Sequence, residues 1–361
     1  MRSFRINTGT LVPRGAHMEA IDELRGLAII LVILYHSGGV LGWPNYLHGE
    51  VGVDIFLLVS GFTLAVSSSD LSLGTFVSRR LLRIYPAYWL ALATILWTHR
   101  ILFGSHYSFD DIAEHAIGIH GFSRLAYFSD INDSFWFISM ILAAYVVFAL
   151  VRRRLDDLSL LVGLCGLLTN AAVVGYQHFG HTGGLISLAA RIPSFFFGLI
   201  AGRLLSAGTA ELRVNLCLTL GLASTYYMTF FRNMACTYTL PAIGLALAWL
   251  ALRRGLGRFS LGRWVLRPVA LLGVVSYEVY LFHQPLIRDY AGAFLARAMN
   301  LPNPTQTQLG LAILGGLAVT LMISVLVHRL VGRFFRRWAR NEPTPAPPGP
   351  RHGPALPLSL C

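Results

Sequence analysis

The stretch "IDELRGLAIILVILYHSGG", residues 21–39, begins with charged residues, becomes almost wholly apolar, and then includes a histidine near its end. Arg25 and His36 are eleven residues apart in it. At 100° per residue, this separation returns to within about 20° of the same helix face and covers roughly 16 Å along the axis. The stretch therefore predicts a membrane-length helix that carries an arginine and a histidine on one side.

The composition is that of a membrane protein. Of 361 residues, 55% are hydrophobic and only 13% are charged, with a mean hydropathy of +0.60, whereas about a quarter of the residues of a soluble domain are charged. All 29 basic residues are arginine, which excludes lysine Schiff-base chemistry and a lysine-type phosphate loop. The four cysteines have neither paired nor metal-like spacing, so we expect no disulfide framework and no metal site.

Apolar stretches of about 20 residues, long enough to span a bilayer, recur through the chain. They predict an all-α integral membrane bundle of about ten transmembrane helices. The expected spans are 24–43, 51–69, 81–103, 134–151, 158–179, 185–206, 213–231, 234–252, 269–291 and 308–331.

The arginines are concentrated in alternate loops and at the end of the last span, which by the positive-inside rule predicts a multi-pass protein with both termini in the cytoplasm. The net charge of +12 is then explained by topology. Its expected partner is the anionic headgroups of membrane lipids, and nucleic-acid binding is not expected.

Three regions are predicted along the chain. Residues 1–18 form an N-terminal extension, in which "LVPRGAHM" (11–18) resembles a protease-cleavable linker, so we leave residues 1–17 out of the fold argument. Residues 19–338 form the transmembrane domain, and the proline-rich residues 339–361 a disordered tail. Within the domain, the acidic loop 104–133 contains "DDIAEHAIGIHGF", which predicts a short helix on the outer surface.

Ionisable residues at membrane depth are candidates for function. His36 is suited to accept a hydroxyl proton because its ordinary pKa lies close to 6.5. Asp54, near the outer end of the second span, could hydrogen-bond the His36 imidazole and fix its tautomer. The alternatives are that His36 only bonds a neighbouring helix, that Asp54 caps its own helix or stays solvated at the interface, and that Arg25 reaches the headgroups.

Further charged and polar residues lie in or near the other spans. Arg80 and Arg83 share a helix face, and arginine forks match phosphate oxygens, although topological charge explains the pair equally well. Arg191 lies inside an apolar run and must meet a carboxylate, carbonyl groups, water or a ligand. In "SYEVYLFHQPL" (276–286), Tyr280 and His283 are interfacial or line a pore.

These stretches together resemble acyltransferase family 3, the bacterial membrane O-acyltransferases of envelope polysaccharides. The resemblance is carried by the Arg25–His36 spacing, "GVDIFLLVSGF" (52–62), "RRLLRIYP" (79–86), "SFWFISMILAAYVVFAL" (134–150), "RIPSFFFGLIAG" (191–202) and "SYEVYLFHQPL", in the order of the family. It implies ten membrane helices in the bacterial inner membrane, an acyl-CoA donor on the cytoplasmic side and an acceptor hydroxyl on the outer side.

Carried onto this sequence, the resemblance makes His36 the catalytic histidine and places Arg25 near the acyl donor. It makes Arg80 and Arg83 the residues suited to the phosphates of CoA. Two positions depart from the pattern of many relatives: Ile141 stands where a glutamate follows Ser139 in W-x-x-S-x-E, and Ser194 stands where an acidic residue often follows R-x-P.

The sequence thus predicts an O-acetyltransferase that uses acetyl-CoA as co-substrate, with no tightly bound cofactor and no metal. The acceptor is a carbohydrate or a lipid-linked molecule. Direct transfer and a covalent acyl-histidine both stay open, as does the oligomeric state. The alternative is a transporter of a small polar or acidic solute, with Arg191, His36, Glu278 and His283 along its path, although no inverted repeat is visible in the sequence.

Overall fold

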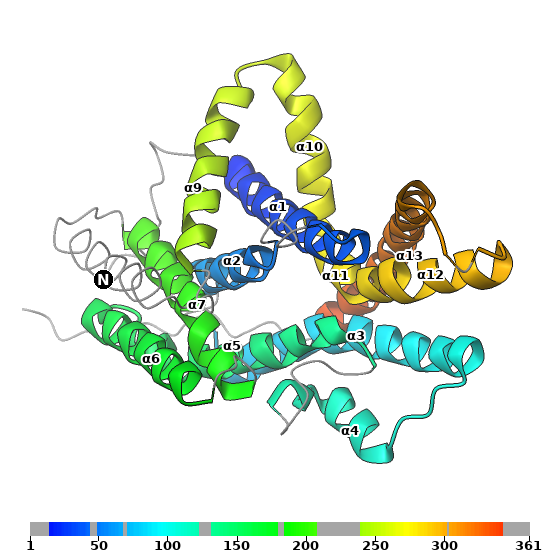
Figure 1. Ribbon diagram of the computed structural model, residues 1–361. Coiled ribbons are helices and arrows are strands. Elements are labelled where there is room, and N and C mark those ends of the chain that lie inside the picture. Colours follow the sequence, from blue (N-terminus) through cyan, green and yellow to red (C-terminus); the bar gives the residue numbers. More distant parts are fainter. Residues whose placement is uncertain are drawn as a thin grey trace, which may run out of the picture.

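The computed structural model describes residues 14–43, 49–67, 71–122, 131–179, 184–207, 239–301 and 303–341. All regular elements in these ranges are helical, as predicted (Figure 1). The α-helices are α1 (Arg14–Leu41), α2 (Val51–Ser67), α3 (Leu73–Phe103), α4 (Phe109–Ile117), α5 (Trp136–Val151), α6 (Leu158–Phe179), α7 (Gly184–Ala207), α9 (Thr239–Leu256), α10 (Ser260–Val274), α11 (Ser276–Gln284), α12 (Ala291–Ala293) and α13 (Gln306–Asn341).

Short 3₁₀ and π segments join several of these helices. The 3₁₀ turns are η2 (His120–Phe122), η3 (Asp133–Phe135) and η4 (Arg152–Arg154), and the π turns are η5 (Pro285–Tyr290) and η6 (Phe294–Ala298). Helix α1 begins at Arg14, inside the predicted extension 1–18. The predicted span 213–231 and the residues of the predicted tail from 342 onward lie outside the described residues.

Three described helices are long and apolar enough to cross a membrane, namely Glu19–Leu41, Asp133–Arg154 and Gln306–Phe334. A fourth candidate is the bent pair Gly262–Val274 and Ser276–Arg297. The chain is therefore an all-α membrane protein, while ten spans and cytoplasmic termini stay predictions.

One predicted span differs in shape from the expectation. Residues 269–291 were expected as a single span, but the chain turns by 73° at the junction of α10 and α11. Val275 causes the break because its φ of −102° and ψ of 10° leave the helical region. The turns that follow α11 are π-helical, and such turns occur often at functional sites.

Helices α1 and α2 lie in the middle of the bundle, with α9 and α10 on one side and α3 and α5 on the other (Figure 1). Glycines let α2 and α7 approach backbone to backbone. A Cβ at Gly61 would lie 2.1 Å from the carbonyl oxygen of Phe195, and one at Gly198 would lie 2.0 Å from that of Leu58. Close contact of this kind is how helices associate in lipid, where the hydrophobic effect does not drive them together.

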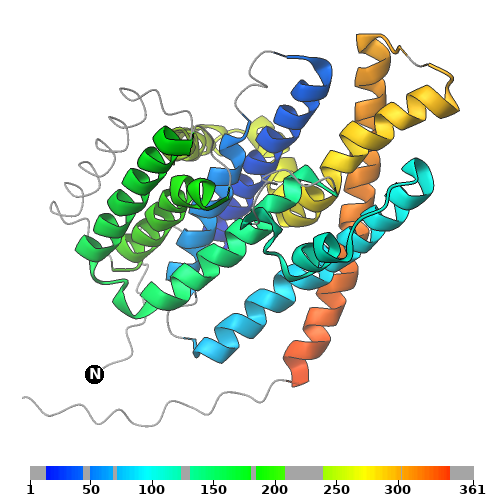
Figure 2. The same cartoon turned by 60° about the horizontal axis from the view of Figure 1, so that its bottom comes forward.

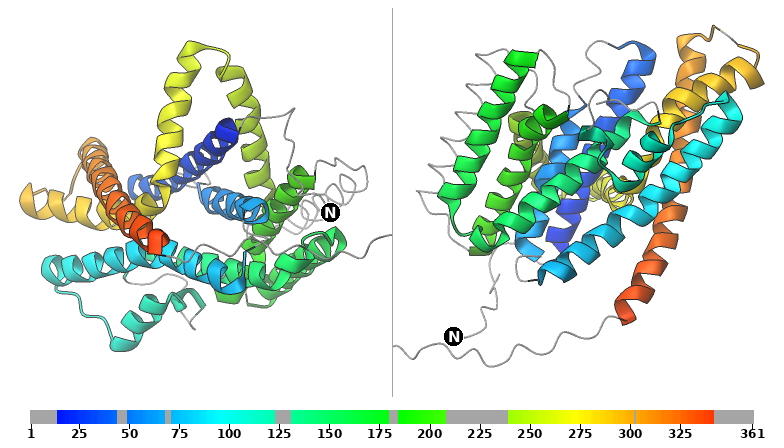
Figure 3. Two further views of the ribbon diagram at one scale, coloured as in Figure 1. Left: turned by 180° about the vertical axis from the view of Figure 1, so that it is seen from behind. Right: turned by 90° about the horizontal axis from the view of Figure 1, so that it is seen from below.

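The two ends of the bundle carry different parts of the chain. The start of α3 and the arginine-rich end of α13 lie at one end, whereas the end of α1, the end of α3 and the start of α13 lie at the other (Figures 2 and 3). The predicted short helix of loop 104–133 is confirmed as α4, with a capping box formed by Ser108 and Asp111. It is held on α3 by Tyr88, whose hydroxyl donates to the His115 carbonyl at 2.7 Å.

Candidate active site

Arg25, Arg80 and Arg83 line one cavity of about 100 Å³ between α1, α2, α3, α5 and the α10–α11 junction. They come from two helices that the sequence alone could not place side by side. Ile141, which stands where many relatives have glutamate, lies in the same wall. The cavity thus brings together three arginines that the sequence singled out.

Each arginine of the cavity has a distinct setting. The Arg25 guanidinium lies 3.1 Å from the Asp22 carboxylate, one turn earlier on α1. Arg80 lies over the rings of Tyr145 and Phe76, 5.6 and 5.8 Å from their centroids. Arg83 is exposed. This cluster of like charges is suited to a polyanion, because arginine binds phosphate oxygens bidentately.

An aromatic group forms the inner wall of the cavity. Phe56, Phe137 and Tyr280 line it and pack on one another, with ring centroids 5.2 to 6.4 Å apart. The Tyr280 hydroxyl donates to the Ser134 carbonyl at 2.6 Å, which fixes the ring in place. The predicted candidate Tyr280 therefore separates the arginine cavity from the residues behind it.

Behind this wall lie two histidines. The rings of His36 and His283 have centroids 5.0 Å apart and are tilted by 57°, and the His283 ring lies 5.5 Å from that of Tyr280. His283 is completely buried, whereas His36 is partly exposed. The sequence named both residues, and the fold brings them together from α1 and α11.

The hydrogen bond of His283 defines its tautomer. Its Nδ1 lies 2.7 Å from the Tyr280 carbonyl oxygen, and a carbonyl only accepts, so Nδ1 carries the proton. In the neutral ring Nε2 then holds a lone pair, and this buried atom has no hydrogen-bond partner among the described residues. The pair His36–His283 thus offers a proton acceptor inside the protein.

Asp54 corrects one prediction. Its carboxylate was expected to bond His36, but Arg191 pairs with one oxygen and the Ser194 hydroxyl donates to the other at 2.7 Å. Asp54 is fully buried where α2 meets α7, and a buried carboxylate needs a partner of opposite charge. The Asp54–His36 bond that the sequence offered as one possibility is therefore wrong, and of the four kinds of partner left open for Arg191 the structure shows a carboxylate.

Ser194 and Ser139 both have local partners. The Ser194 hydroxyl also lies 2.8 Å from that of Thr239, so the ion pair reaches α9. The Ser139 hydroxyl accepts a bond from the Gly121 amide at 3.0 Å and is buried. Ser139 therefore holds η2 against α5, and it does not line the arginine cavity.

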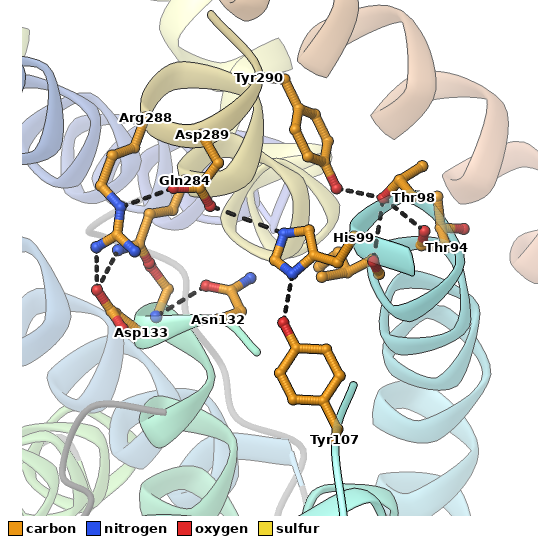
Figure 4. A network of polar contacts seen from close by, with 12 residues as sticks. Thr94, Thr98, His99, Tyr107, Asn132, Asp133, Gln284, Arg288, Asp289 and Tyr290 are labelled. Carbon is orange, nitrogen blue, oxygen red and sulfur yellow. Dashed lines mark hydrogen bonds and ion pairs between the residues drawn. The ribbon is translucent and has the colours of Figure 1, made fainter. Parts of the chain in front are cut away.

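A polar network that the sequence did not single out includes Gln284, the residue directly after His283 (Figure 4). Arg288 pairs with Asp133 and, at 2.9 Å, with Asp289. The Gln284 amide donates to Asp133 at 3.2 Å. The signal available in the sequence was Gln284 together with the adjacent charged residues Arg288 and Asp289, all within six residues after His283.

A second part of the network centres on His99. Its Nδ1 lies 2.6 Å from the Tyr107 hydroxyl and its Nε2 lies 3.9 Å from the Asp289 carboxylate (Figure 4). Tyr290 contacts the hydroxyl of Thr98 on the same helix as His99. These side chains join α3 to η5, so the residues after His283 are anchored on two sides.

The sequence profile of the family described as "Acyltransferase domain" matches residues 18–329. The chain belongs to acyltransferase family 3. It is 26% identical to a protein of Komagataeibacter xylinus named as the membrane-bound transacylase BcsY, over 94% of this chain and 88% of that protein. Membership of the family makes this membrane protein an acyltransferase.

Two further relatives match over smaller parts. One is a protein of Bacillus subtilis named as the peptidoglycan O-acetyltransferase YrhL, 32% identical over 34% of this chain and 18% of its own length. The other is the peptidoglycan O-acetyltransferase OatA of Listeria monocytogenes, 32% identical over 22% of this chain and 13% of its own length. No solved structure matches the chain.

Proposed function

We propose that this acyltransferase moves an acetyl group from acetyl-CoA to a hydroxyl of a carbohydrate or other envelope acceptor. The observation that carries the proposal is the cavity in which Arg25, Arg80 and Arg83 converge, with the pair His36–His283 behind its aromatic wall. The arginines suit the phosphates of CoA, and the imidazoles suit a hydroxyl proton. Membership of an acyltransferase family sets the transporter alternative aside.

In the proposed reaction, CoA phosphates bind to the arginines and the pantetheine arm leads the thioester toward Tyr280. The acceptor hydroxyl attacks the thioester carbonyl carbon while His36 takes the hydroxyl proton. The tetrahedral intermediate then breaks the carbon–sulfur bond, and the imidazolium returns the proton to the departing thiolate. The products are the O-acetyl ester and CoA, so atoms and charges balance without a cofactor or metal.

A covalent route gives the same products through an acetyl-histidine. It predicts ping-pong kinetics, with parallel lines in double-reciprocal plots, whereas direct transfer predicts intersecting lines. The path also needs the rings of Phe56, Phe137 and Tyr280 to move apart, because in the structure they close the cavity toward His36.

The proposal includes the topology and location that the sequence predicts. We place the protein in the bacterial inner membrane with ten spans and both termini in the cytoplasm, so that the arginine cavity opens to cytoplasmic acetyl-CoA. The arginine-rich end of α13 and the start of α3 lie at the same end of the bundle, which supports this orientation (Figure 2).

The test measures base-labile acetate released from the envelopes of cells that express wild type, His36→Ala or the control His106→Ala at equal membrane levels. His106 is an exposed histidine beyond the end of α3. We expect wild type and His106→Ala to raise acetate to the same level and His36→Ala to give the background level. Wild-type acetate from His36→Ala would refute the role of His36.

A further inference from the structure

An apolar groove of about 490 Å³ lies between the π-helical segment after His283 and the first half of α13. Leu286 and Phe294 form one wall and Leu311 and Val319 the other, with Tyr290 and Gln308 among the few polar residues that line it. Its volume is within the range of about 300–1,000 Å³ that is typical of ligand pockets.

Two glycines of α13, Gly315 and Gly316, line the groove. A Cβ at Gly316 would lie 2.6 Å from the Leu286 carbonyl oxygen, so this glycine allows close packing, whereas a Cβ at Gly315 would have nothing within 4 Å. A larger apolar residue at position 315 would face lipid equally well but would fill part of the groove. The glycine at 315 therefore keeps open a space that an apolar chain can enter.

The position of the groove separates it from the arginine cavity. Twenty residues of α3 separate Arg83, in the cavity, from Phe103, whose ring stacks on that of Tyr290 at 6.1 Å. Twenty residues of α-helix extend about 30 Å, the thickness of the hydrocarbon core. The groove thus lies at the depth of the leaflet opposite the arginines.

The polar network extends from Tyr290, which lines the groove, to Gln284 (Figure 4). Leu286 and Tyr290, which line the groove, belong to the same π turn as Arg288, whose partner Asp133 also accepts from Gln284. Gln284 directly follows His283 in the chain. A molecule whose tail lay in the groove could therefore place a polar head beside His36 and His283.

We propose that the groove binds the hydrocarbon tail of the acceptor, so that the acceptor hydroxyl is carried on a lipid-anchored molecule of the leaflet opposite the arginine cavity. Carboxylate, guanidinium and amide groups of the network then bind the hydroxylated head, and the tail sets its depth. This inference rests on the proposed acyl transfer, because it names the class of acceptor for that reaction.

The experiment compares wild type with Gly315→Leu and Gly310→Leu. Both glycines are on α13 and neither would bring a Cβ within 4 Å of another atom, but only Gly315 lines the groove. Val319→Trp fills the groove from a second position and serves if Gly315→Leu does not fold. The proteins are placed in phosphatidylcholine vesicles with a diazirine-tagged dodecyl β-D-glucoside, irradiated, and mapped by mass spectrometry.

We expect the diazirine to label peptides from 286–301 and 308–319 in wild type and Gly310→Leu, with at least fivefold less label in Gly315→Leu or Val319→Trp. Excess untagged dodecyl glucoside should displace the label, and added phosphatidylcholine should not. Equal labelling of all the proteins, or displacement by phosphatidylcholine, overturns the proposal, because the groove would then hold ordinary membrane lipid.

A second readout separates this proposal from the proposed function. With acetyl-CoA, we expect wild type to acetylate dodecyl β-D-glucoside at least tenfold faster than methyl β-D-glucoside, and Gly315→Leu to lose this preference. Equal rates on the two glucosides refute the proposal that the groove binds the acceptor tail, and leave the proposed acyl transfer intact. Groove-specific labelling together with no base-labile acetate in the envelope assay supports the groove and refutes the proposed function.

Discussion

At the scale of single residues, the proposed site contains two imidazoles that differ in solvent exposure. His283 is fully buried and bound through Nδ1 to the carbonyl of Tyr280, whereas His36 is partly exposed. A proton acceptor must reach the proton it removes, so the more accessible ring is the better general base. We therefore assign proton transfer to His36, and we assign to His283 the positioning of that ring.

The positioning role of His283 gives a prediction. In His283→Gln the ring beside His36 is lost, and we expect kcat for acetyl transfer to fall about tenfold or more while KM for acetyl-CoA stays within twofold. The control is His328→Gln on α13, because His328 contacts Glu278 at 3.0 Å rather than His36. An equal loss of kcat in both variants would contradict a specific role for His283.

We expect Arg80 to bind the phosphates of the acyl donor, acetyl-CoA. Removing a charged hydrogen-bond donor from a phosphate costs about 1.5–3 kcal/mol, so Arg80→Ala should raise KM for acetyl-CoA roughly 10- to 100-fold with kcat little changed. Arg79→Ala is the matched control, because Arg79 is the adjacent arginine and does not line the cavity. Steady-state kinetics test this role. A lowered kcat at unchanged KM would show that Arg80 does not bind the phosphates.

At the scale of elements, the contact between α2 and α7 combines close glycine packing with the buried pair Asp54–Arg191. The pair also reaches α5, since Arg191 lies over the Trp136 ring at 5.2 Å. A buried pair contributes little net stability when complete, but one partner alone leaves an uncompensated charge. The packing of α2, α5 and α7 therefore supports α1 and α11, which carry His36 and His283.

The buried pair predicts a non-additive mutant cycle. Asp54→Asn should destabilise the protein by about 3–5 kcal/mol because Arg191 loses its counter-charge. The double variant Asp54→Asn with Arg191→Met should recover a large part of this loss. Thermal unfolding in detergent measures both, and additive losses in the double variant would show that the two residues act independently.

The stacked rings of His115 and His120 predict a pH effect on the α4–η2 segment. The rings lie 3.9 Å apart and are buried. Burial lowers the pKa of His120 to about 3 and also lowers that of His115, although Asp111 and Glu114 near His115 act against the shift. Because the folded pKa values lie below the unfolded value of about 6.5, the stability of this segment is complete above that value and falls as the pH drops toward 3.

Hydrogen exchange checks this effect. We expect amides of residues 109–122 to exchange faster at pH 5 than at pH 7.5, after correction for intrinsic rates, whereas the amides of α5 change little. His120→Asn should remove most of the difference. Equal protection of residues 109–122 at both pH values would contradict the account.

At the scale of the whole molecule, the sequence predicted the class of fold better than how residues pair. The all-helical membrane fold followed from hydropathy and is confirmed. Arg25, Arg80 and Arg83 were singled out by spacing and by the family resemblance, and the structure brings them to one cavity, while their roles stay predictions. The partner of Asp54 did not, because the rotation of each helix about its axis is set by packing. The bend at Val275 was missed because no proline stands at the break, and hydropathy does not report the φ and ψ of a single residue.

The proposed function places the two substrates at opposite ends of the molecule. Donor binding is assigned to the arginine cavity at one end, acceptor binding to the polar network and groove at the other, and the histidines lie between them. Such an arrangement lets a donor from one side of the membrane react with an acceptor on the other side, without transport of the whole donor.

The most direct test adds radiolabelled acetyl-CoA to inside-out membrane vesicles from cells that express wild type or His36→Ala, and measures base-labile label. The account predicts label with wild type, none above background with His36→Ala, and none when intact right-side-out vesicles receive the same acetyl-CoA. Equal label from both proteins, or label in right-side-out vesicles, would contradict transfer from a donor held at the arginine end through His36.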